Sequence, residues 1–287
     1  MFFVIILSFV FILALPHAAL AWGPATHLEI ASAVLNDTAA FTLPLRALLE
    51  NFPYDFLYGN ISADIVVGKN LVEELKHCHN WKTGFKLLRK AGNGPQKAFA
   101  YGYMSHLAAD TVAHNRFIPE MMIRSFSTNI LRHIYWELRF DAFADKKTWQ
   151  MPRRILDRID PENDLLLDSI IEDSPLSFKT NKRIFSGIHS IQSFEHWHTM
   201  LLLISATSKW TLEREDREKY FNASLDAVKD FLLFQHDAAC IKNDPTGRHS
   251  LNAASHIRRK LKSIRRQGRD WEEALDNALR WVGSPKA

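Results

Sequence analysis

The sequence predicts an all-α protein, built as a single multi-helix domain. Apolar residues recur at helical spacing along most of the 287-residue chain. Strand-like alternation bounded by tight turns is scarce. The chain has neither an internal repeat nor a low-complexity linker, so one large domain is the simplest account.

The first residues indicate an export signal. Residues 2–15 are almost entirely apolar, and Ala19 and Ala21 occupy the small-residue positions that a signal peptidase recognises. The run is shorter than the roughly 20 apolar residues of a membrane span. We therefore expect a signal peptide over 1–21, export to the periplasm or the exterior, and a mature chain that begins with Trp22. The alternative is an uncleaved N-terminal anchor, because the segment has no Lys or Arg.

Composition limits the remaining possibilities. The two cysteines, Cys78 and Cys240, are too few for a disulfide scaffold and could form one bridge or remain two buried thiols. The net charge is +4, and the surplus lies in a basic helical C-terminal segment, 245–287, which we expect to follow a main domain over 22–244. We expect no dedicated nucleic-acid module, and the sequence indicates no protein partner.

Helices are predicted in order along the mature chain. His27–Leu35 has amphipathic spacing, with Thr26 as its N-cap. An Asn-Gly-Pro break precedes a long helix over about 95–115, because proline favours the first helical turn. Pro119 begins another helix, which is expected to run to about 143.

Later elements are shorter and more broken. Three prolines divide the next stretch into short helices or turns, namely Pro152, Pro161 and Pro175. Further helices are expected over Ile191–Trp210, Glu215–Gln235 and Leu251–Arg266, with a short last one that starts at Asp270. Acidic residues in the first turn of that last helix favour it.

The long helix over 95–115 carries a row of three metal-binding residue types. His106, Asp110 and His114 follow one another at four-residue intervals, so they share a helix face with about 6 Å of rise between neighbours. The row winds slowly around the helix, so its two ends can face different metal ions while Asp110 bridges them. Gly102, one turn earlier, leaves space on the same row.

The next predicted helix repeats this spacing with His133 and Glu137. Imidazole and carboxylate groups bind zinc at about 2.0–2.2 Å. Two helices that present such pairs inward form a metal site in the core of a helical bundle. One such pair is weak evidence, but two pairs together with a third histidine in register favour a metal site.

The order of these residues, preceded by Asp64 and His79, resembles that of the zinc-dependent phospholipase C family. Secreted members of that family begin with a tryptophan that binds zinc through its own terminus, and Trp22, five residues before His27, would supply it after cleavage. The resemblance is tight over 22–141. The pattern is also similar to that of the single-strand-specific zinc nucleases, so it indicates a superfamily rather than one substrate.

The resemblance implies an all-helical domain whose cleft holds about three zinc ions. The expected ligands, zinc by zinc, are the amine and carbonyl of Trp22 with His27; Asp64, His79 and His106; and His114, His133 and Glu137. Asp110 would be shared by the first two zincs. Asp64 would also orient or deprotonate the attacking water, so Asp64 and Asp110 are the expected catalytic residues.

The chain departs from the family's secreted bacterial toxins at several positions. Ala25 stands where those enzymes have an acidic residue that helps to hold choline, and Ile65 follows Asp64 where an aromatic side chain would help to surround a quaternary ammonium. Choline specificity is therefore not implied. His114 also follows Asp110 more closely than in those toxins.

Other histidines compete for these roles. His77 is the alternative to His79, which we prefer because Trp81 follows it as aromatic side chains follow the ligand in the family. His196 and His198 would point about 200° apart on a helix, so they cannot share a metal ion.

The C-terminal segment suggests a second kind of contact. Residues 258–269 contain seven cations and no acid, and Ile257, Leu261 and Ile264 fall on one helix face. A basic amphipathic helix could rest on anionic lipid or nucleic acid. The alternative is a solvated helix face that packs through its three aliphatic residues.

Together these features predict an exported zinc-dependent phosphodiesterase of the phospholipase C type, which hydrolyses phospholipids to diacylglycerol and a phosphorylated head group. Two alternatives stay open. One is a single-strand nuclease or nucleotidase on the same scaffold, which aromatic side chains that stack bases would favour. The other is a non-catalytic, zinc-stabilised binding domain.

Overall fold

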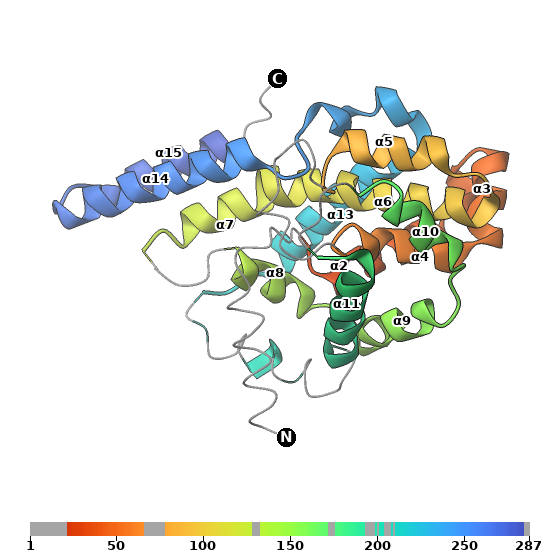
Figure 1. Ribbon diagram of the computed structural model, residues 1–287. Coiled ribbons are helices and arrows are strands. Elements are labelled where there is room, and N and C mark those ends of the chain that lie inside the picture. Colours follow the sequence, from red (N-terminus) through yellow and green to blue (C-terminus); the bar gives the residue numbers. More distant parts are fainter. Residues whose placement is uncertain are drawn as a thin grey trace.

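The computed structural model describes residues 22–65, 78–127, 133–171, 176–192, 199, 201–203, 208 and 210–283, and every regular element within these ranges is a helix (Figure 1). The predicted all-α class is confirmed. Several predictions lie outside the described residues: the leader over 1–21, His77, Pro175, His196, His198 and most of the helix expected over Ile191–Trp210. Within the described part of the chain, no helix has the length and apolar character needed to cross a membrane.

The central element is α6 (Gly94–Val112), which is buried along most of its length and passes through the middle of the molecule (Figure 1). It begins where the Asn-Gly-Pro break predicted, because the side chain of Asn93 caps it by accepting a hydrogen bond from Gln96 N at 2.9 Å. A π-helical turn, η4 (Ala113–Phe117), continues it into α7 (Ile118–Arg124).

The closest neighbour of α6 is α4 (Pro53–Ser62). A Cβ atom on Gly102 would lie 2.0 Å from the carbonyl oxygen of Phe56, and one on Gly59 would lie 2.0 Å from that of Phe99. The two glycines therefore let the helix backbones touch. The space that Gly102 leaves on the helix is filled by the backbone of α4.

The remaining helices surround this pair. They are α2 (Pro24–Asn36), α3 (Leu43–Asn51), α5 (Trp81–Lys90), α8 (Ile134–Asp141), α9 (Lys146–Leu156), α10 (Glu162–Asp168), α11 (Phe178–Gln192), α13 (Arg214–Phe234), α14 (Arg248–Arg266) and α15 (Trp271–Gly283). The predicted helices near α2, α13, α14 and α15 are confirmed. Both cysteines are buried thiols, and no disulfide joins them.

Three local predictions were wrong. Gly23, not Thr26, occupies the N-cap position of α2, because Pro24 is already in the first helical turn. Thr26 lies inside that helix and is buried. Pro152 does not divide the chain but lies within α9. The single helix expected from Pro119 to about 143 is two helices, α7 and α8.

The end of α7 has a local cause. Ser125 follows its last residue, and the Ser125 hydroxyl donates a hydrogen bond to the carbonyl oxygen of Met121 at 2.6 Å. Serine side chains that bond to the backbone in this way compete with helix continuation. The chain can therefore leave α7 and bring α8 back toward the centre of the molecule.

Candidate metal centre

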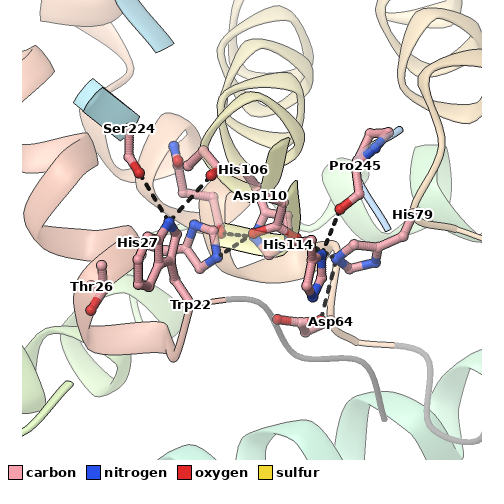
Figure 2. A network of polar contacts seen from close by, with 12 residues as sticks. Trp22, Thr26, His27, Asp64, His79, His106, Asp110, His114, Ser224 and Pro245 are labelled. Carbon is pink, nitrogen blue, oxygen red and sulfur yellow. Dashed lines mark hydrogen bonds and ion pairs between the residues drawn. The ribbon is translucent and has the colours of Figure 1, made fainter. Parts of the chain in front are cut away.

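The predicted ligand side chains converge beside the second half of α6 (Figure 2). They form three clusters that could each hold a metal ion: His27, His106 and Asp110; Asp64, His79 and His106; and His114, His133 and Glu137. Within each cluster the ligand atoms lie within 4.8 Å of one another. The grouping matches the one that the sequence predicted, except that His106 also approaches the first cluster.

Asp110 lies between the first two clusters. Its Oδ1 is 3.2 Å from Nε2 of His27, whereas its Oδ2 is 3.0 Å from Nε2 of His79 and 3.1 Å from Nε2 of His106. The two carboxylate oxygens therefore face different histidines. This is the geometry that a carboxylate shared by two metal ions needs.

The ligand atoms of the second cluster are close enough together to share one metal ion. In a tetrahedral site with bonds of about 2.0–2.1 Å, neighbouring ligand atoms are about 3.3 Å apart. Nε2 of His79 lies 2.7 Å from Nε2 of His106 and 3.5 Å from Oδ1 of Asp64. The pattern favours His79 as the member of this cluster, while His77 lies outside the described residues.

The third cluster joins the π-helical turn to the start of α8. Nε2 of His133 is 3.0 Å from Oε1 of Glu137, and the rings of His114 and His133 meet edge to face at 5.0 Å. The four-residue spacing of His133 and Glu137 places both on one face of α8, as predicted. The π-helical turn presents His114 to them from the end of α6.

Two backbone carbonyls fix the tautomers of the ligand histidines. Nδ1–H of His106 donates to the carbonyl oxygen of Asn60 at 2.8 Å, and Nδ1–H of His114 donates to that of Pro245 at 2.6 Å. A carbonyl oxygen can only accept, so each Nδ1 carries the proton and Nε2 keeps a lone pair for a metal ion. Backbone partners leave no side-chain pattern, which is why sequence reasoning missed them.

The charge distribution suits a divalent cation. Burial alone would raise the pKa of Asp110, but His106 and the hydrogen bonds from the neighbouring histidines outweigh it and hold that pKa well below its usual range. Burial and repulsion from His106 lower the pKa of His27. The cluster thus combines an ionised carboxylate with one imidazole, His27, that favours its neutral form. Burial opposes a charge on His106, but Asp110 outweighs it and raises the pKa of His106, so a metal ion that binds there displaces a proton from that ring.

Burial separates the inner ligands from the outer ones. The side chain of His27 is buried; its Nε2 faces only Oδ1 of Asp110, at 3.2 Å, and its Nδ1 makes no hydrogen bond to a described residue. Buried polar atoms of this kind need a partner, and a metal ion would satisfy one of them. By contrast, 13% of the Asp64 side chain and 22% of the His133 side chain are exposed. Among the described residues, Asp64 and His133 are therefore the members of the clusters with the most exposed side chains.

Trp22 is held by hydrogen bonds to the helix that carries the first cluster and to α13 (Figure 2). It is fully buried, and its indole Nε1–H points at the carbonyl oxygen of Ala109 at 3.2 Å and the hydroxyl of Ser224 at 3.1 Å. Ala109 immediately precedes Asp110, so the tryptophan is anchored to the turn of α6 that carries Asp110. Metal binding by the Trp22 amine and carbonyl stays a prediction.

Asp141 is a functional candidate that sequence reasoning missed. Its Oδ1 accepts hydrogen bonds from the backbone N–H of Thr26 at 3.0 Å and from the Thr26 hydroxyl at 2.5 Å, and a Cβ atom on Gly23 would lie 2.0 Å from its Oδ2. The carboxylate therefore fixes the chain just after Trp22. It continues the four-residue row that contains Glu137, and that repeat was the signal available in the sequence.

The environment of Asp141 predicts that the stability of the folded protein depends on pH. Burial raises its pKa to about 7, although hydrogen bonds from Thr26 and Ala25 oppose the rise. An unfolded aspartate has a pKa of about 3.9, so the folded state retains a proton that the unfolded state has lost. Stability should therefore fall as the pH rises from about 4 to 7.

The Asp141→Asn variant tests this dependence, because asparagine cannot ionise. Thermal unfolding of both proteins is measured at pH 5 and pH 8 at one fixed zinc concentration. We expect the variant to gain stability relative to the wild type at the higher pH. Asp168→Asn, at an exposed position, is the control and should show no such gain. An equal pH response in wild type and Asp141→Asn would contradict the prediction.

Comparison with known proteins identifies the family of this chain. No curated protein and no solved structure matches the chain. The family model of zinc-dependent phospholipase C matches residues 26–184, which is more than half of the chain and includes every residue of the three clusters. Both the ligand geometry and the match therefore lead to one conclusion: the chain belongs to the zinc-dependent phospholipase C family.

Proposed function

We propose that the mature chain is an exported zinc-dependent phosphodiesterase that hydrolyses phospholipids. Membership of a family of zinc-dependent phospholipases C implies a hydrolase. The observation that carries the proposal further is the position of Asp110, whose two oxygens face the histidines of two clusters. Export rests on the leader, with cleavage between Ala21 and Trp22.

The proposed ligands are those of the three clusters together with the terminus of Trp22. Zinc bound there would make a water nucleophilic near neutral pH and neutralise the negative charge of the phosphate. Asp64 is the proposed base, because it belongs to a cluster and its side chain is partly exposed. It would orient the water and take its proton.

The reaction is a simple hydrolysis. The oxygen of the water forms a bond to phosphorus, and the bond between phosphorus and the glycerol oxygen breaks. That oxygen leaves with a proton as the hydroxyl of diacylglycerol, and the phosphorylated head group is the other product. His133, the most exposed ligand, would lie nearest to the bound phosphate from the third cluster.

The head-group preference follows from two buried residues. Ala25 and Ile65 stand where choline recognition would be expected, and both side chains are buried. A desolvated cation–π contact is worth about 2 kcal/mol, or roughly 30-fold in rate or affinity. We therefore propose that this chain lacks that selectivity for phosphatidylcholine over phosphatidylethanolamine.

One experiment separates the candidate functions. Mature protein is incubated in parallel with phosphatidylcholine, phosphatidylethanolamine and single-stranded DNA, before and after removal of zinc with a chelator. We expect diacylglycerol from both lipids at rates within about threefold, loss of activity on chelation and recovery with added zinc. Release of nucleotides without diacylglycerol would favour the nuclease, and a zinc-loaded but inactive protein would favour the binding domain.

The basic surface of α14 supports a contact with anionic membrane. Leu261 and the buried Arg258 lie against the protein, while Arg259 and Lys260 are exposed. Near the end of the helix, a cavity of about 320 Å³ is lined by Phe126, Ser127, Lys262, Arg265 and Arg266. An anionic leaflet attracts such a segment by about 1 kcal/mol per cation near the surface.

Neutralising two of these cations tests the contact. Arg259→Gln with Lys260→Gln should weaken binding to vesicles that contain phosphatidylserine by about tenfold or more, while hydrolysis of a soluble short-chain lipid stays unchanged. The matched control is Arg153→Gln with Arg154→Gln, which removes two exposed charges from α9. Equal vesicle binding by both double variants would assign α14 a purely structural role.

A further inference from the structure

We propose that a short segment outside the matched family region, which we call the strap (residues 243–250), positions His114 for metal binding. This inference rests on the proposed zinc clusters. The strap runs from the end of the 3₁₀ helix η6 (Ala239–Lys242) into the first turn of α14, far beyond residue 184 where the family match ends. Its backbone reaches the third cluster directly (Figure 2).

The first contact is the hydrogen bond from Nδ1–H of His114 to the carbonyl oxygen of Pro245, at 2.6 Å. Both residues are buried, so water does not compete for this bond. The bond fixes the ring orientation and leaves Nε2 as the metal-binding nitrogen. Partners of this kind hold ligand histidines in place, and their loss lowers metal affinity by about 10–100-fold.

The second contact requires a glycine. Gly247 has a φ of +56°, and a Cβ atom there would lie 2.4 Å from Cβ of His114 and 2.5 Å from its carbonyl oxygen. A left-handed φ favours glycine at this position. The close approach of His114 excludes a side chain there for a second, independent reason. Any side chain at this position would push the strap away from His114 and lengthen the bond to Pro245.

The turn itself is encoded by Asp244, Pro245, Thr246 and Gly247. Gly247 N donates to the carbonyl oxygen of Asp244 at 3.0 Å, and the Asp244 carboxylate accepts from Thr246 N at 3.0 Å. Aspartate first, proline second and glycine fourth are the preferred residues of a type I turn. The sequence thus builds a rigid turn whose second carbonyl faces the histidine.

Side chains from two other elements hold the strap in place. Asn115, next to His114, donates through Nδ2 to the carbonyl oxygen of Asp244 at 2.8 Å and accepts from the Ser250 hydroxyl at 3.0 Å. Trp81 donates through Nε1 to the carbonyl oxygen of Asn243 at 2.8 Å. Trp81 follows His79 by two residues, so the strap connects the chain beside the second cluster to the third cluster.

The test compares two glycines that share the same backbone conformation. Gly247→Ala introduces both backbone strain and the clash with His114. Gly268→Ala is the matched control, because Gly268 also has a positive φ of +67° but no atom lies within 4 Å of its would-be Cβ. Zinc per chain is measured by elemental analysis, and zinc affinity by competition with a chelator.

We expect Gly247→Ala to lose one zinc of about three, or to hold that zinc about 10–100-fold more weakly. Gly268→Ala should keep the wild-type zinc content and affinity. If Gly247→Ala fails to fold, Asn115→Ala serves instead, because it removes two anchors of the strap from a partly exposed position. It should weaken the same zinc while the other two stay bound.

The protonation state of the His114 ring can be measured independently of activity. Nitrogen NMR of the wild type should show His114 protonated at Nδ1, and Asn115→Ala should alter that signal. Unchanged zinc affinity and an unchanged His114 signal in both strap variants would overturn the proposal. A wild type that holds three zincs but does not cleave lipid would overturn the proposed function alone.

Discussion

Asp110→Asn should be among the most damaging single changes in this protein. Asparagine keeps the shape of the side chain but loses the negative charge that faces the histidines of two clusters at 3.0–3.2 Å. Two dications would then lose both a shared ligand and the charge that neutralises them. We expect hydrolysis to fall by more than about 100-fold, the upper range for partners that only support a ligand, with loss of more than one zinc.

The control for this variant is His256→Ala, which removes an exposed imidazole from α14. It should leave both the zinc content and the rate of hydrolysis unchanged. Two results would place the site on other residues. One is an Asp110→Asn protein with full zinc and full turnover, and the other is equal impairment of the two variants.

Adding one alanine before Trp22 should reduce activity more than Trp22→Phe does. The extension converts the terminal amine into an amide, which has no lone pair for a metal ion, whereas phenylalanine keeps the amine. Trp22→Phe removes the hydrogen bonds to Ala109 and Ser224, so its main cost should be stability, of about 1–3 kcal/mol. We expect the extended form to be at least about tenfold less active and to hold less zinc.

The comparison uses three proteins: one that starts at Trp22, one with an extra alanine before Trp22, and the Trp22→Phe variant. Each is assayed for hydrolysis, zinc content and thermal unfolding. The unfolding temperature separates a folding defect from a ligand defect. Equal activity and equal zinc in the extended protein would remove the terminus from the metal site.

The fold class and the long central helix could be predicted because local signals agree. Asn93 caps α6, Pro95 lies in its first turn, and nearly every residue from Ala98 to Val112 is buried. The break between α7 and α8 could not be predicted in this way. No proline or glycine marks it, and the Ser125 side chain at the end of α7 bonds to the backbone carbonyl of Met121.

The convergence of these side chains into clusters could be predicted because a helix turns a four-residue spacing into a shared face. His106, Asp110 and Glu137 lie in the clusters that this spacing indicated. The hydrogen bonds that support His106 and His114 could not be predicted from the sequence. Asn60 and Pro245 accept them through backbone carbonyl oxygens, which every residue possesses. Their partners are also far away in the sequence, so only the packed structure brings them together.

The most direct measurement is anomalous diffraction at the zinc edge from crystals of the mature protein grown without chelator. We expect three peaks: one between His27 and Asp110, one among Asp64, His79, His106 and Asp110, and one among His114, His133 and Glu137. The first two should lie on opposite oxygens of Asp110. No peak in these clusters, from a protein that hydrolyses phospholipid at its full rate, would contradict a zinc-dependent site built on these residues.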